Sequence, residues 1–148
     1  MIPEVPTVLA GIAQRIMADI GPELTSPYHA FTVQLLPPLL MMIAQEFDRA
    51  AARFADENDA LVELFRDAQR EVQDGELQAA LREATAAPSP SLLVSALRER
   101  NRVLRGLLVR LHAHVEACEP AALRALNERI WAELAASTQR RQLDLANG

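Results

Sequence analysis

The stretch Phe31-Thr-Val-Gln-Leu-Leu-Pro-Pro-Leu-Leu-Met-Met-Ile-Ala44 decides the fold of this chain. Nearly every residue in it is apolar, so the sequence marks no single face as the buried one. A helix that is apolar all round needs cover on most sides, from neighbouring helices, a second subunit or a membrane. We therefore expect the central helix of a small bundle, partly shared with a partner chain, with Leu36, Leu40 and Met41 at the shared surface.

Two prolines interrupt this stretch. Pro37 and Pro38 remove two backbone donors and clash with the preceding turn, so they must kink the helix or split it in two. The apolar register continues beyond them to Phe47 and Phe54, which favours a kink. Such a kink can open backbone carbonyls for a ligand, but more often it only bends a helix around its neighbours.

Apolar residues recur at helical spacing along the rest of the chain, and no strand pattern or long repeat interrupts them. The breaks are Gly21-Pro22, where glycine suits the C′ position, then Ser26-Pro27, Asp74-Gly75 and Pro120. They predict helices over about 6–20, from Pro27 to Asp74, over 76–86, from about Leu93 to Cys118, and from Pro120 onward. The expected fold is all-α: an up-and-down bundle of about five helices in a single domain, 1–148, with a linker near 86–90.

Composition limits the possible functions. Half of the 148 residues are hydrophobic but only 4% are aromatic, which favours helix over strand. The net charge of −5 argues against nucleic-acid binding, because such binding relies on a basic surface. All fifteen basic residues are arginines, which excludes Schiff-base chemistry by lysine, and the single cysteine, Cys118, cannot form an internal disulfide. Without a signal-type N-terminus, and with its apolar stretch broken by prolines, the chain is expected to be cytoplasmic and not membrane-bound.

Polar residues beside the apolar stripes of the last two predicted helices are the candidate site. A short turn at Glu119-Pro120 makes these helices antiparallel, which places His112 level with Asn127 and Asn101 level with Thr138. Such residues form internal hydrogen bonds or line a pocket. The pocket interpretation is a small-ligand or metal site built from His112, Glu116, Asn127 and Glu46.

A metal site is the weaker form of that hypothesis. His112 and Glu116 share a helix face, but metal sites in bundles draw ligands from several helices. His29 and Glu46 are 17 residues apart, or ~25 Å along a helix, and cannot share one metal ion. The chain contains neither a Glu-x-x-His nor a Cys-x-x-Cys pair. We therefore predict no metal and no cofactor, and a surface His/Glu pair instead.

Charged runs are interpreted structurally. The run Asp56-Glu57-Asn58-Asp59 has neither the spacing nor the glycine of a calcium loop, so it is expected to be a solvated helix surface or an N-cap. The arginines at 98, 102 and 105 form a stripe that could hold a phosphate or an acidic partner. Internal or interchain ion pairing is the default expectation, because the acidic residues at 57, 63, 67 and 71 are available on another helix.

Trp131 directly follows Ile130 of the inward stripe Leu123, Leu126, Ile130, Leu134, Ala135. It should therefore point away from the core. Aromatic side chains are enriched in protein interfaces, so we expect Trp131 at an interface, although packing against the helix over 76–86 explains it almost as well.

Three segments together carry a resemblance: Tyr28-His-Ala-Phe31, Met42-Ile-Ala-Gln-Glu-Phe47 and Ala125-Leu-Asn-Glu-Arg-Ile-Trp131. Over about half of its length the chain resembles a group of small bacterial helical proteins encoded beside phosphotransferase-like and acyl-CoA dehydrogenase-like genes. The resemblance implies an accessory role and assigns no functional residue. The leading hypothesis is a non-enzymatic accessory or protein-interaction module, present as a homodimer.

Overall fold

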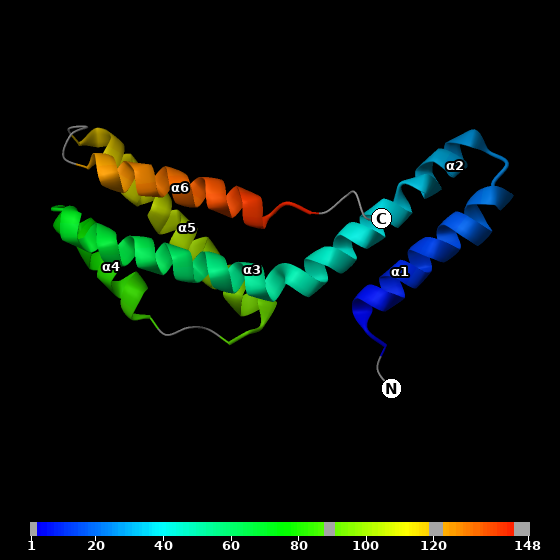
Figure 1. The fold of residues 1–148 in the computed structure, drawn as a ribbon, viewed down its shortest axis with the longest axis horizontal. Helices are drawn as coiled ribbons and strands as arrows, with labels where there is room; N and C mark the ends of the chain where they lie inside the picture. The colour runs from blue at the N-terminus through cyan, green and yellow to red at the C-terminus, as the bar shows by residue number, and fades with distance from the viewer. Residues whose placement is uncertain (1–2, 88–90, 119–122, 144–148) are drawn as a thin grey trace. The chain divides into compact units, whose positions relative to one another are not determined.

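The computed structural model describes residues 3–87, 91–118 and 123–143, and every regular element in these ranges is helical. The α-helices are α1 (Val5–Arg15), α2 (Pro27–Gln34), α3 (Leu36–Glu71), α4 (Gly75–Ala86), α5 (Val94–Ala117) and α6 (Arg124–Arg140) (Figure 1). A π-helical turn, Ile16–Ile20, and a 3₁₀ turn, Gly21–Glu23, follow α1. The predicted all-α helical bundle is confirmed.

The chain forms two compact units that share α3. The N-terminal unit comprises Met1–Ala50 with Gln142–Gly148, and the C-terminal unit comprises Ala51–Arg141. The boundary between these units falls inside α3, and the single domain with a linker near 86–90 stays a prediction. Residues 88–90 and the predicted Glu119-Pro120 turn lie outside the described ranges.

The C-terminal unit is built around one apolar core. The end of α3 with α4, α5 and α6 supplies the buried side chains, which recur every three or four residues along each helix. Phe65 of α3, Leu81 of α4, Leu111 of α5 and Ile130 of α6 are completely buried. The inward stripe predicted for α6 is wrong at one position: Ala135 is exposed, because it lies about 100° around the helix from Leu134.

The predicted break at Asp74-Gly75 is confirmed, and side chains stabilise both helix ends there. Asp74 is the N-cap of α4, and its Oδ1 accepts a 2.7 Å hydrogen bond from the backbone N–H of Leu77. Gln78 Nε2 donates to the carbonyl oxygens of Gln69 and Val72 near the end of α3. Backbone groups that a helix end leaves unpaired are therefore satisfied on both sides of the turn.

The N-terminal unit is a helical hairpin in which α1 is followed by a corner and then by α2 and the start of α3 (Figure 1). The first helix ends near Gly21, as predicted, but Gly21 keeps a helical φ of −54° instead of the left-handed conformation of a C′ glycine. Ser26 precedes Pro27 at the start of α2, as predicted, although its side chain makes no capping hydrogen bond.

The two prolines neither bend a helix in its middle nor separate two distant helices. α2 ends at Gln34, Leu35 stays in the right-handed helical region, and α3 begins at Leu36. Pro37 and Pro38 therefore occupy the first turn of α3, where a missing N–H costs no intrahelical hydrogen bond. The result is a one-residue interruption at Leu35.

Candidate functional site

The most conspicuous surface feature of the N-terminal unit is a row of large exposed apolar side chains on α2 and the first part of α3. We call it the apolar stripe, and its members are Tyr28, Phe31, Leu35, Leu39, Ile43 and Phe47. Steps of three and then four residues keep them on one helical face. Phe31 is 64% exposed and Phe47 is 57% exposed, so this face is uncovered in the single chain.

The opposite, inner side of the hairpin is lined by small residues. Ala13 of α1 and Ala44 of α3 are buried, as is Pro37. A shallow hollow remains near the corner, lined by residues that include Ile16, Met17 and Val33. The fully buried side chains of this unit are thus small, whereas Leu40 and Met41 are only partly buried and the residues of the apolar stripe are exposed.

The first helical segment adds to the exposed apolar surface, through Val5, Val8, Ile12, Met17 and Ile20. The sequence from Leu24 to Gln45 contains no Asp, Glu, Lys or Arg, so the stripe is uncharged over most of its length. Among the described residues, one continuous helical span, Pro27–Glu71, is long and apolar enough to cross a membrane by length and composition alone. Such a single span is weak evidence, since helices of other kinds pass the same test.

Helices of the same chain do not cover this face, so of the kinds of cover expected for this stretch, a second subunit or a membrane is left for it. Of the residues expected at a shared surface, Leu36 is exposed, whereas Leu40 and Met41 are partly buried toward the hairpin. The more exposed Leu39 and Ile43 were missed. Both carry the signal that could have found them, because they continue the four-residue spacing from Leu35 to Phe47.

Trp131 lies in the C-terminal unit and is 55% exposed, as expected for a side chain that points off the core. The ring of His112 packs against its edge, with the ring centroids 5.2 Å apart. The tryptophan therefore has a neighbour in its own chain, the partly buried His112 of α5. Its predicted place in a protein interface stays a prediction.

The structure brings three of the four predicted pocket residues to one end of the α5–α6 pair. His112 Nε2 lies 3.5 Å from Glu116 Oε1, and Glu116 and Asn127 both line a surface hollow of about 350 Å³. Within the described chain, His112 Nε2 and Asn127 Oδ1 are buried and make no hydrogen bond. Asn127 Oδ1 is therefore the polar atom that lacks a partner at this hollow within the described residues, whereas His112 Nε2 has the Glu116 carboxylate as a neighbour.

Glu46, the fourth predicted pocket residue, belongs to the N-terminal unit. The described residues contain no group of three or more His, Cys, Asp or Glu side chains that could hold a metal ion. Cys118 Sγ lies 3.7 Å from His114 Nε2, one helical turn away.

The acidic run in α3 is the clearest correction to the sequence analysis. Glu57 is only 1% exposed and Asn58 is 5% exposed, so half of the run faces the interior and not solvent. Glu57 Oε1 accepts hydrogen bonds from Ser137 Oγ at 3.1 Å and Arg141 Nε at 3.0 Å. Glu57 Oε2 accepts from Arg141 Nη2 at 2.7 Å and from Asn101 Nδ2 at 3.1 Å.

This network joins three helices of the C-terminal unit. Asn101 of α5 also donates to Asn58 Oδ1, and Asn58 Nδ2 donates to the carbonyl of Leu97. Burial alone would raise the pKa of Glu57, but hydrogen bonding and charge from Arg141, with bonds from Ser137 and Asn101, hold it below its ordinary value of 4.5. A buried carboxylate satisfied in this way is a structural element, and Asn101 pairs with Glu57 instead of the expected Thr138.

Among the described residues of this single chain, the arginine stripe of α5 does not pair with the acidic residues of α3; interchain pairing stays a prediction. Arg102 bonds to Glu99 of its own helix, and Arg105 donates to Ser137 of α6. Arg98 lies 5.8 Å from the ring centre of Phe54. The acidic residues of α3 pair with α6 instead: Glu57 with Arg141, and Asp67 and Glu71 with Arg129.

No protein-family model matches this chain, and neither a similar curated protein nor a similar solved structure was found.

Proposed function

We propose that this chain is a non-enzymatic accessory module that acts through protein interaction, and that two copies associate through the apolar surface of their N-terminal units. The resemblance to small bacterial helical proteins supports the accessory role, and we place the protein in the cytoplasm. The observation that carries the proposal is the apolar stripe from Tyr28 to Phe47.

The exposed apolar area is large enough for a stable dimer. Twelve large apolar side chains of the N-terminal unit are between 39% and 75% exposed. At about 150–200 Å² each when fully exposed, they present on the order of 1,000 Å² in total over α1, the π-helical turn, α2 and α3, and the six residues of the apolar stripe contribute somewhat more than half of this area. A standard interface buries about 800 Å² per partner, and the largest apolar patch of an ordinary monomer covers about 300–600 Å².

A second copy of the chain is the partner that this surface fits best. A two-fold axis places the same patch on both sides of an interface, so an uncharged patch meets its twin without like-charge repulsion. Two hairpins paired in this way form a four-helix arrangement in which each stripe is covered. Against a membrane as the covering surface, the charged residues Glu46, Asp48 and Arg49 lie next to Phe47 at the end of the stripe, and the polar residues Thr32 and Gln34 lie in the same segment of sequence.

Sedimentation velocity on matched variants tests this proposal. Ile43→Asp places a carboxylate on the stripe and should shift the protein to monomer, because an interface cannot bury an unpaired charge. Val109→Asp is the control, since Val109 is 69% exposed on α5 of the C-terminal unit and should leave the wild-type association unchanged. A monomeric wild type that floats with lipid vesicles would contradict the proposal and favour a membrane surface.

The second candidate is a small-ligand site at the hollow beside Glu116 and Asn127, favoured by Asn127 Oδ1, which is buried and makes no hydrogen bond within the described residues. A buried acceptor without a partner is costly, and a ligand with hydrogen-bond donors would satisfy it. This candidate is confined to residues of the C-terminal unit and so leaves out Glu46. It predicts that the wild-type protein binds a small amine or amide and that Asn127→Leu removes this binding. Binding is measured by the NMR chemical shifts of residues in α5 and α6.

A further inference from the structure

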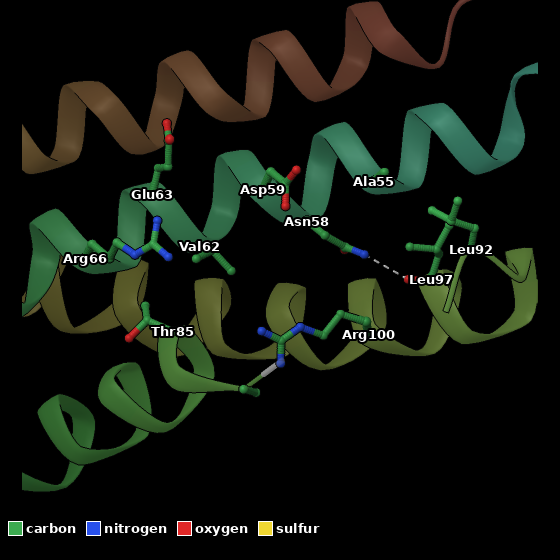
Figure 2. Close-up of a pocket in the computed structure, with 11 residues that line it drawn as sticks. Ala55, Asn58, Asp59, Val62, Glu63, Arg66, Thr85, Leu92, Leu97 and Arg100 are labelled. Atoms are coloured by element: carbon green, nitrogen blue, oxygen red, sulfur yellow. Dashed lines mark hydrogen bonds between the residues drawn. The ribbon is translucent and has the colours of Figure 1, made fainter. Parts of the chain in front are cut away.

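We propose that a cavity in the C-terminal unit, between α3, α4 and α5, binds a small organic anion with an apolar body. The cavity has a volume of about 350 Å³, within the range of small-molecule pockets. Its lining side chains come from all three helices and from the ends of the α4–α5 connection (Figure 2). This inference is independent of the proposed dimer, because it uses no residue of the N-terminal unit.

One part of the lining is apolar. Val62 of α3 and the buried Leu97 of α5 contribute aliphatic surface, and Leu92, just before α5, is 79% exposed at the cavity. Exposed aliphatic surface around a concave site gains from being covered by an apolar group. The cavity therefore suits a ligand that carries a hydrocarbon or aromatic portion.

The neutral polar side chains of the cavity already form hydrogen bonds within the protein. Asn58 Nδ2 donates to the carbonyl of Leu97, and its Oδ1 accepts from Asn101. Thr85 Oγ1 donates to the carbonyl of Arg82 and accepts from Gln69 Nε2. These groups shape the cavity but have little hydrogen-bonding capacity left for a ligand.

Two arginines retain free donors. Arg100 uses Nη2 to bond the carbonyl oxygen of Ala84 at the end of α4, which fixes its guanidinium at the cavity and leaves its other N–H groups available. Arg66 lines the cavity from α3 and makes no hydrogen bond or ion pair within residues 3–87, 91–118 and 123–143. A guanidinium group favours carboxylate or phosphate oxygens, to which it can donate two parallel hydrogen bonds.

Two carboxylates also border the cavity, and their positions affect which charge a bound ligand can carry. In Figure 2 the guanidinium groups of Arg66 and Arg100 lie on the side of α3 that faces α4 and α5. The Glu63 carboxylate points to the other side of α3. Asp59, Glu63 and Arg66 are all exposed, so water screens their charges, whereas Arg100 is partly buried. The free donors thus face the cavity, and at least one of the two carboxylates points away from it.

NMR titration of the ¹⁵N-labelled full chain tests the inference with four probes of one size. Benzoate and phenyl phosphate carry the two anionic groups, benzylamine carries a positive charge, and benzyl alcohol is neutral. We expect either anion to give saturable shifts around Ala55–Arg66 and Thr85–Arg100 at concentrations up to roughly 10 mM. Benzylamine and benzyl alcohol should give none.

A matched pair of variants assigns the binding to the cavity. Arg66→Gln should weaken anion binding roughly tenfold, because it removes a charged hydrogen-bond donor. Arg70→Gln is the control: Arg70 lies one turn further along α3, is exposed and does not line the cavity, so affinity should stay at the wild-type value. Three results would overturn the inference: no saturable anion shift, equal binding of benzylamine, or an Arg66→Gln variant as tight as wild type.

Discussion

Arg141→Ala is the sharpest test of how the C-terminal unit is held together. Arg141, directly after α6, donates two hydrogen bonds to the buried Glu57, at 3.0 and 2.7 Å. Without it, Glu57 keeps only the neutral donors Ser137 and Asn101, and its charge stays in the interior. The variant therefore exposes the cost of an unbalanced buried carboxylate.

The magnitude follows from burial on the two sides of the pair. A hydrogen bond to a charged group contributes about 1.5–3 kcal/mol, and breaking a fully buried ion pair costs about 3–5 kcal/mol. The Arg141 side chain is 43% exposed, so solvent screening reduces its share. We expect a loss of roughly 2–3 kcal/mol in the free energy of unfolding, which lowers Tm by roughly 5–10 °C.

Urea unfolding followed by circular dichroism at pH 7 measures this loss. Arg110→Ala is the control, because the ion pair of Arg110 with Glu76 is exposed on both sides and should contribute almost nothing. An Arg141→Ala variant as stable as Arg110→Ala would refute the view that Glu57 anchors α6 to α3.

Three further predictions concern stability. Because the pKa of Glu57 is lowered in the folded protein, its carboxylate stabilises the fold above its unfolded pKa, and this stabilisation is lost as the pH falls through its folded pKa. The urea midpoints of wild type and Glu57→Gln should therefore differ less at pH 3 than at pH 7. Asp74→Ala removes the N-cap of α4 and should cost about 0.5–2 kcal/mol in urea unfolding, whereas Asp74→Asn should restore most of it. Leu111→Ala, at a fully buried position, should cost about 2–5 kcal/mol, and Val109→Ala on the exposed face should cost well under 1 kcal/mol; equal losses would contradict the described core.

Helix positions were predictable where local chemistry decides them. Asp74-Gly75 marks the start of α4 because a carboxylate there pairs with free N–H groups, and this needs no tertiary information. The helix from about Leu93 to Cys118 was equally clear from its apolar spacing, and Leu104, Leu108 and Leu111 of α5 are buried.

Long-range pairing was not predictable from one sequence. Glu57 looked like part of a solvated acidic run, and only its partner Arg141, 84 residues away, explains its burial. The effect of Pro37 and Pro38 was ambiguous in the sequence because it depends on where a helix begins. In the structure α3 begins at Leu36, after a one-residue interruption at Leu35. Neither feature has a local signature.

The candidate site was partly predictable. Helical spacing placed His112 beside Glu116 and level with Asn127, as the structure has them at one end of the α5–α6 pair. Composition could not show which residues of the apolar stretch face solvent, because Leu39, Leu40 and Met41 are all apolar. Packing of small residues such as Ala44 on the inner side turns Leu39 outward.

The molar mass of the wild-type protein in solution tests the central claim most directly. Size-exclusion chromatography with light scattering, run without detergent over a hundredfold range of concentration, should give twice the chain mass of 16.3 kDa at the higher concentrations. A mass of 16.3 kDa throughout, with the stripe from Tyr28 to Phe47 open to solvent by hydrogen–deuterium exchange, would contradict the claim that a second copy covers it.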